Sequence, residues 1–319
     1  MKKICIEWAF SVFIGLLAPF SILSTVDKLE PISPDIFQET AQEHQDIVSL
    51  MIPVLQDDGQ VIMMDLDQYL TGVVLAEMPA AFEEEALKAQ AVVARTYTMN
   101  RIDSGGKHLQ GAICMDPACC QAYCDPDSYL QKGNQTECLE KIKNAVLSTS
   151  GSVLMYQGKY IDATYFSCSG GRTEDAVAVW GTDVPYLQAV DSPGEEEASH
   201  YTDTVEFSIK DFKQMLGIDE KVMLRIGNIT YTDGSGVATI EISGTTFKGT
   251  ELRQILKLRS TVFVIQVLGD VVSITTKGYG HRVGMSQYGA QAMALEGIKY
   301  PQILQYYYTG ATLDRIAGN

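Results

Sequence analysis

Glu77 is the residue whose type and position most directly suggest chemistry. Apolar residues at positions 69 to 74 recur at helical spacing, which predicts a helix here. Because Met78 precedes Pro79, the α conformation is disfavoured there, and we expect the helix to end near Glu77. The helix dipole and apolar neighbours would both favour the neutral carboxyl group. A carboxylic acid that stays protonated near neutral pH is what a general acid for glycoside cleavage requires. The alternative is a solvated glutamate at a helix end.

A second helix is predicted after Pro79, with acidic residues in its first turn and many alanines that permit close packing. Lys88 and Arg95 fall on one face of this helix. They are either solvated or they line a groove, where they would bind sugar hydroxyls or carboxylates. If they lay close to Glu77, their charge would lower its pKa and oppose the effects above.

A short loop concentrates soft metal ligands. Cys114, Cys119, Cys120 and Cys124 lie within eleven positions, and His108 lies just upstream. Disulfides are one interpretation in an exported protein, although adjacent cysteines rarely bond to each other. Tetrahedral zinc is the other, because it favours four thiolate or imidazole ligands. Outside this loop, Cys138 and Cys168 either pair with each other or remain free.

Two glycine-bearing loops carry further polar side chains. In residues 165–174, two glycines permit a tight turn, and Ser, Arg and Thr can donate hydrogen bonds to sugar hydroxyls. Residues 278–290 form a glycine loop leading into a helix, with Ser286 as a plausible N-cap. The spacing of its glycines does not match a phosphate-binding loop. Each loop also has an alternative interpretation. The first would be an ordinary turn, and in the second His281 would be a structural hydrogen-bonding residue.

The elements around these motifs predict an α+β protein. Its 319 residues allow two domains, and the net charge of −16 argues against nucleic acid as a partner. Ser208 and Thr250 are candidate helix caps. We expect a membrane anchor at residues 1–26, with a cleaved signal peptide as the alternative, and a juxtamembrane linker at 27–49. A core at 50–204 and 269–319 would then contain an inserted β-rich domain at 205–268.

The motifs, in this order, resemble the SpoIID/LytB family over residues 61–310. Residues 69–97 are similar to the family's core motif, whose glutamate before Met-Pro is the catalytic acid. Residues 165–174 resemble its Ser-Gly-Gly-Arg/Tyr-Thr-Glu loop. Residues 280–287 resemble its Gly-His-Gly-Val-Gly-Met-Ser-Gln signature, with Arg282 in place of the middle glycine.

The resemblance implies a SpoIID-type catalytic core with Glu77 as catalytic acid. It also implies the clostridial type of zinc loop, in which Cys119 replaces a second histidine and Cys124 is an alternative ligand. Four protein ligands would make the zinc structural. The implied zinc ligands are His108, Cys114, Cys119 and Cys120. The implied substrate-binding residues are Lys88, Arg95, Tyr97, Ser167, Ser169, Arg172, Thr173, His281, Ser286 and Gln287.

By the same resemblance, the chain is expected to be a membrane-anchored, exported lytic transglycosylase. It would cleave peptide-stripped peptidoglycan between N-acetylmuramic acid and N-acetylglucosamine during forespore engulfment. A partner cell-wall amidase and a membrane protein would accompany it at the mother-cell membrane. Two other classes remain open: a zinc-dependent cell-wall hydrolase, and a non-catalytic glycan-binding enhancer of an amidase.

Overall fold

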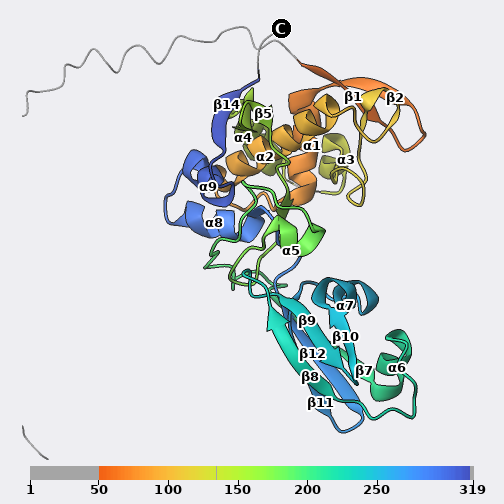
Figure 1. The fold of residues 1–319 in the computed structure, drawn as a ribbon. Coiled ribbons are helices and arrows are strands. Elements are labelled where there is room, and N and C mark those ends of the chain that lie inside the picture. Colours follow the sequence, from red (N-terminus) through yellow and green to blue (C-terminus); the bar gives the residue numbers. More distant parts are fainter. Residues whose placement is uncertain (1–49, 134, 317–319) are drawn as a thin grey trace, which may run out of the picture. The chain divides into compact units, whose positions relative to one another are not determined.

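The computed structural model describes residues 50–133 and 135–316, which form a mixed α+β fold with several small sheets (Figure 1). The helices are α1 (Leu66–Glu77), α2 (Glu84–Asp103), the 3-10 helix η2 (Leu109–Gly111), α3 (Pro126–Gln131), α4 (Thr136–Ser148), α5 (Ala176–Trp180), α6 (Ile209–Met215), α7 (Gly249–Ile255), α8 (Gln287–Leu295) and α9 (Tyr300–Tyr307). The strands are β1 (Met51–Leu55), β2 (Val61–Asp65), β3 (Ile113–Cys114), β4 (Ser152–Tyr156), β5 (Lys159–Tyr160), β6 (Tyr165–Phe166), β7 (Thr202–Ser208), β8 (Ile226–Tyr231), β9 (Val237–Ile242), β10 (Thr245–Lys248), β11 (Val262–Leu268), β12 (Val271–Lys277), β13 (Met285–Ser286) and β14 (Thr312–Arg315).

The helix pair predicted around Pro79 is present as α1 and α2. The Asp65 side chain caps α1 by accepting a hydrogen bond from the Gln68 amide at 2.9 Å. The helix stops after Glu77 because Met78, which precedes the proline, is extended (φ −128°, ψ 139°). In α2, a run from Ala86 to Thr98 is buried almost without interruption, so α2 is a central helix rather than a surface one.

One hydrophobic core surrounds these two helices. It joins side chains of α1 and α2 to those of β1, α4, β4, α8 and α9. Three sheets border it, with strand orders β2-β1-β3, β14-β4-β5 and β13-β6. In the last of these, β13 runs parallel to β6, with Met285 opposite Tyr165 and Ser286 opposite Phe166. Strands from distant parts of the sequence therefore meet where α1 ends.

A second hydrophobic core lies between residues 205 and 274. It is formed by α6, α7 and two three-stranded antiparallel sheets, with orders β10-β9-β8 and β11-β12-β7 (Figure 1). The boundary predicted at residue 268 divides the second sheet, because β12 pairs with both β11 and β7 and contributes Val272 and Ile274 to this core. The β-rich segment therefore extends to Lys277.

Of the two helix caps predicted in the β-rich segment, Ser208 and Thr250, only Ser208 is one, since its hydroxyl accepts from the Asp211 amide at 3.0 Å. The Thr250 prediction is wrong, because α7 begins at Gly249 with Lys248 at the cap position. The predicted anchor and linker at residues 1–49 lie outside the described residues. Within residues 50–133 and 135–316, no helix has the length and apolar character needed to cross a membrane.

Candidate active site

The carboxyl group of Glu77 lies among three groups from other segments. The Ala122 amide donates a hydrogen bond to Glu77 Oε1 at 3.1 Å. The Tyr165 hydroxyl and the Gln287 side chain approach the same carboxyl group. The Tyr165 hydroxyl also donates to Gln121 Oε1 at 3.3 Å. The Gln287 amide nitrogen is buried and does not reach hydrogen-bond geometry with any described residue.

Burial raises the pKa of Glu77, and the contacts from Ala122, Tyr165 and Gln287 only partly oppose this effect. The two cations that would have lowered this pKa are engaged elsewhere. Lys88 forms ion pairs with acidic residues of its own helix, and Arg95 forms one with Asp67. The site therefore favours the neutral carboxylic acid, the form needed to donate a proton.

The neighbours of Glu77 are held by β6, β13 and α8. Ser286 caps α8 by accepting from the Gly289 amide at 3.1 Å, and its hydroxyl lies 3.4 Å from the Ser167 carbonyl oxygen. This cap fixes Gln287 in the first turn of α8. Ser286 itself is fully buried and acts through this positioning.

Four predicted metal ligands converge. The ligand atoms of His108, Cys114, Cys119 and Cys120 all lie within 4.8 Å of one another. His108 Nε2 is 3.4 Å from Cys119 Sγ and 3.8 Å from Cys120 Sγ, and the two sulfur atoms are 3.9 Å apart. Zinc–ligand bonds of about 2.0–2.3 Å give tetrahedral edges of about 3.5–3.8 Å. The donor set and its spacing thus fit zinc. Cys124 is not in the cluster.

The segment after this cluster contacts Glu77 and its neighbours. Ala122 binds the Glu77 carboxyl group, as described. The Gln121 side chain is buried, and its amide nitrogen donates to the Thr98 hydroxyl at 2.9 Å while its oxygen accepts from Tyr165. A folded cysteine loop therefore helps to set the position of the carboxyl group. The cysteines of the described chain, Cys138 and Cys168 included, form no disulfide.

The serine-glycine loop is built around a buried carboxylate. Glu195 Oε2 accepts from the Ser169 amide at 2.6 Å, the Ser169 hydroxyl at 2.8 Å and the Gly170 amide at 3.0 Å. A side chain at Gly170, whose φ is 83°, would press on the Lys277 carbonyl oxygen, so the close approach of the two glycine loops requires glycine here. Ser169 is buried and its hydroxyl donates to Glu195, so its side chain is not free to bind a sugar.

The other polar residues of this loop differ in exposure and in hydrogen-bond partners. Thr173 is buried, and its hydroxyl accepts from the Val190 amide at 2.8 Å, which makes it structural. Arg172 is partly exposed and forms an ion pair with Asp191 at 2.5 Å. The Ser167 hydroxyl lies 2.6 Å from His200 Nε2.

His200 was missed from the sequence because it stands 33 residues from Ser167, beyond an irregular acidic stretch. Its ring lies edge-on to Tyr279 and Tyr288. Burial and the charge of Arg259 lower the pKa of His200, and a neutral ring with an unprotonated Nε2 can accept a hydrogen bond from the Ser167 hydroxyl.

His281 packs against the rings of Phe166 and Trp180, with centroids 5.7 and 5.4 Å away. Its Nδ1 accepts from the Val283 amide at 3.2 Å. Burial, aided by the charge of Arg253, lowers the pKa of His281 to about 4. The ring is therefore neutral at physiological pH and unsuited to act there as a general acid.

Three residues expected to contact substrate from α2 have other partners. Arg95 is fully buried and donates to Asp67 and to backbone carbonyls, so it is not free to bind a sugar. Lys88 lies 2.7 Å from Glu84 and 3.3 Å from Glu85. Tyr97 is mostly buried beneath the Arg101 guanidinium. Helical spacing placed Lys88 and Arg95 on one face of α2, but it did not predict the protein groups that bind their side chains.

Comparison with known proteins gives consistent matches. A family model described as SpoIID, Stage II sporulation protein, matches residues 56–156. Stage II sporulation protein D of Bacillus amyloliquefaciens is 41% identical over 270 residues, covering 82% of this chain and 78% of that protein. Its namesake in Bacillus subtilis (strain 168) is 40% identical over 269 residues, with the same coverage. The amidase enhancer of Bacillus subtilis (strain 168) is 30% identical over 300 residues, covering 76% of this chain but 40% of that protein.

Proposed function

The chain belongs to the stage II sporulation protein D (SpoIID) family, whose members are involved in sporulation, and we propose that it is a lytic transglycosylase of peptidoglycan. The observation that carries the proposal is the Glu77 carboxyl group, which lies among Ala122, Tyr165 and Gln287 and whose pKa is raised by burial. A glycosidic oxygen is a poor leaving group until it is protonated, and a neutral carboxylic acid supplies that proton.

In the proposed mechanism, Glu77 protonates the oxygen that links N-acetylmuramic acid to N-acetylglucosamine, and the bond from muramic C1 to this oxygen breaks. The muramic C6 hydroxyl oxygen then bonds to C1, and its proton passes to the Glu77 carboxylate. The products are a 1,6-anhydro end and a free hydroxyl, and Glu77 returns to its neutral form. No water is consumed, so one carboxyl group serves both steps, unlike the pair required by hydrolases.

We further propose that zinc bound by His108, Cys114, Cys119 and Cys120 is structural. Four protein ligands complete a tetrahedral site and leave no open position for a reacting water. When bound, the ion would cross-link the loop that presents Ala122 to Glu77. Cys114→Ser should lower both zinc content and thermal stability, whereas Cys124→Ser should leave zinc content unchanged. Equal zinc content in the two variants would contradict this ligand set.

The proposed setting is the mother-cell membrane facing the forespore, with residues 1–26 as a single-pass anchor and the rest outside the cytoplasm. We propose that the substrate is glycan stripped of peptides by a partner amidase, in a complex with a membrane protein. The similarity to a protein named amidase enhancer supports a connection with amidases. Deletion of residues 1–26 should release the chain from the membrane fraction, and retention there would contradict the anchor.

The decisive experiment is mass spectrometry of peptide-free glycan incubated with the wild type and with Glu77→Gln. Glutamine keeps the size of the side chain but cannot transfer a proton, and we expect a loss of about 10²- to 10⁴-fold in anhydro ends. Glu140→Gln is the matched control, because Glu140 is exposed and forms a surface ion pair with Lys143.

Three outcomes would contradict the proposal in different ways. Anhydro ends from both the wild type and Glu77→Gln would remove Glu77 from the mechanism. Ordinary reducing ends, abolished by chelation while the fold survives, would indicate the zinc-dependent hydrolase. Glycan binding without any cleavage by the wild type would support the non-catalytic enhancer of an amidase.

A further inference from the structure

Arg282 combines a buried charge with an unusual backbone. Its side chain is 1% exposed, and its φ of 70° lies in the left-handed region that favours glycine. An arginine persists in such a conformation only where surrounding contacts compensate for it.

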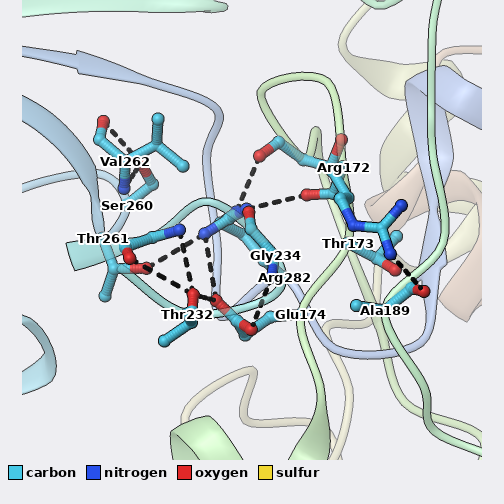
Figure 2. A network of polar contacts seen from close by, with 12 residues as sticks. Arg172, Thr173, Glu174, Ala189, Thr232, Gly234, Ser260, Thr261, Val262 and Arg282 are labelled. Carbon is cyan, nitrogen blue, oxygen red and sulfur yellow. Dashed lines mark hydrogen bonds and ion pairs between the residues drawn. The ribbon is translucent and has the colours of Figure 1, made fainter. Parts of the chain in front are cut away.

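The Arg282 guanidinium contacts three separate segments (Figure 2). Nε donates to the Ser169 carbonyl oxygen at 2.7 Å, and Nη2 donates to that of Arg172 at 2.7 Å, both in the serine-glycine loop. Nη2 also donates to the Gly234 carbonyl oxygen, in the turn between β8 and β9. Nη1 donates to the Thr261 hydroxyl at 3.1 Å, just before β11. One side chain thus links the two glycine loops to the β-rich segment.

Glu174 completes this arrangement from the serine-glycine loop. It is 1% exposed, and its Oε2 lies 3.5 Å from Arg282 Nη1. Glu174 accepts from the Thr232 hydroxyl at 2.5 Å and from the Gly234 amide at 3.2 Å, while its own amide donates to the Arg282 carbonyl oxygen at 2.6 Å. A side chain at Gly234 would clash with the Thr173 carbonyl oxygen, so the turn packs directly on the loop backbone.

The same network connects to the proposed active site. Arg282 lies three residues before Met285, which pairs with Tyr165, and five before Gln287. Tyr165 and Gln287 are the two side chains that approach the Glu77 carboxyl group. Displacement of the Arg282 loop would therefore move the groups that bury and orient this carboxyl group.

We infer that Arg282 and Glu174 form a buried clasp through which the turn at residues 232–236 of the β-rich segment holds both glycine loops in place around Glu77. Both are positioning residues, and the inference rests on the proposed function. The β-rich segment then has a role in the geometry of catalysis as well as its own fold.

The test combines kinetics with amide hydrogen exchange on the full chain. In Arg282→Gln, we expect faster exchange in residues 167–175 and 278–286, while the exchange of α2 is unchanged. Displacement of about 1 Å around reacting atoms can cost about 100-fold in rate, so kcat should fall about 10- to 100-fold with a smaller change in KM. The alkaline limb of the pH profile should move to lower pH, because a less enclosed Glu77 ionises more readily. Arg225→Gln, at an exposed arginine of the same β-rich segment, should change neither measurement.

Two further variants separate the clasp from simple folding. Arg282→Lys should fold but should not protect the loops, because an ammonium group donates from a single nitrogen and cannot reach the acceptors that Nε, Nη1 and Nη2 of the guanidinium reach. Arg282→Met with Glu174→Gln removes both buried charges, and this double variant should fold yet still show rapid loop exchange. Wild-type exchange in that folded double variant would overturn the clasp. If the wild type makes no anhydro ends, the proposed function fails, but the exchange data still decide whether the clasp exists.

Discussion

The helical region around Glu77 and the loop region facing it are each organised by a buried arginine. Arg95, in α2, pairs with Asp67 at 3.0 Å and donates to carbonyl oxygens at the end of α4 and the start of β4. Arg282 pairs with Glu174 at 3.5 Å and donates to three carbonyl oxygens in loops and turns. Both side chains are almost fully inaccessible, and in both the guanidinium faces one carboxylate and several carbonyl oxygens.

The two regions differ in the other interactions that stabilise them. The segments around Arg95 are regular helices and a strand, which carry their own backbone hydrogen bonds and a shared hydrophobic core. The loops around Arg282 are mostly irregular and are joined by scattered backbone pairs, such as the isolated bridge between Cys168 and Tyr279. The same chemistry therefore supports the fold in one region and the geometry of the site in the other. Losing Arg95 should cost stability first, and losing Arg282 should cost activity first.

The largest expected stability effect is that of Arg95→Met. Methionine fills similar space but removes the cation that pairs with Asp67 and the donors to the carbonyl groups of α4 and β4, so the free energy of unfolding should fall by about 3–5 kcal/mol. Urea denaturation measures this loss, and activity per folded molecule should change little. Arg101→Met is the matched control, because its ion pair with Asp162 is partly exposed and worth at most about 1 kcal/mol. Intact stability with lost turnover would return Arg95 to the substrate groove and remove the contrast between the regions.

In the helical region, the sequence predicted the helices themselves but not the contacts of their buried side chains. The proline after Met78 and the apolar spacing of α1 were sufficient to predict where the first helix ends, because these are local effects. The partners of Arg95 were not predictable, since they lie 28 to 57 residues away and are mostly backbone carbonyls. Side-chain spacing identifies which residues share a face of a helix but not what packs on it.

In the loop region, the glycines predicted turns and Ser286 predicted the start of α8. The burial of the charged side chains of Arg282 and Glu174 was not predicted. The substitution at Arg282 implied only a position that tolerates a side chain, and its clasp with Glu174 depends on a turn 48 to 60 residues away. Residue type and spacing identified the cysteine loop as a candidate metal site, and the family resemblance implied its four donors. Only the three-dimensional arrangement distinguishes Cys119 from Cys124 as a member of the cluster.

His281 gives the next largest prediction, and it concerns the loop region at acidic pH. Its pKa is lowered to about 4 in the folded protein from an ordinary value of 6.5, so the unfolded chain binds its proton first. The stability associated with the neutral ring is present above pH 6.5 and is lost as the pH falls toward 4, by up to about 3 kcal/mol.

His281→Asn keeps an acceptor for the Val283 amide but has no proton to bind, so its stability should vary less between pH 6.5 and 4. Thermal melts across this range, for variant and wild type together, measure the difference. His200→Asn is the control and should have a smaller effect, since the pKa of His200 is lowered less. Parallel curves for His281→Asn and the wild type would show that the loops admit a charged ring.

Lys88→Gln should have the smallest effect, and it tests whether cations of the helical region serve only the fold. Lys88 pairs with Glu84, which is 58% exposed, and with Glu85, both one turn away on α2. Such pairs on a helix contribute about 0.3–0.5 kcal/mol and weaken with salt, so the loss of stability should be small and should vanish at high ionic strength. Glu84→Gln should lower stability by a similar amount, because it removes the same interaction. Glycan KM should stay unchanged in both variants. A KM that rises about tenfold in Lys88→Gln alone would place this cation in the glycan groove and would mean that the helical region contributes more than Glu77 to the site.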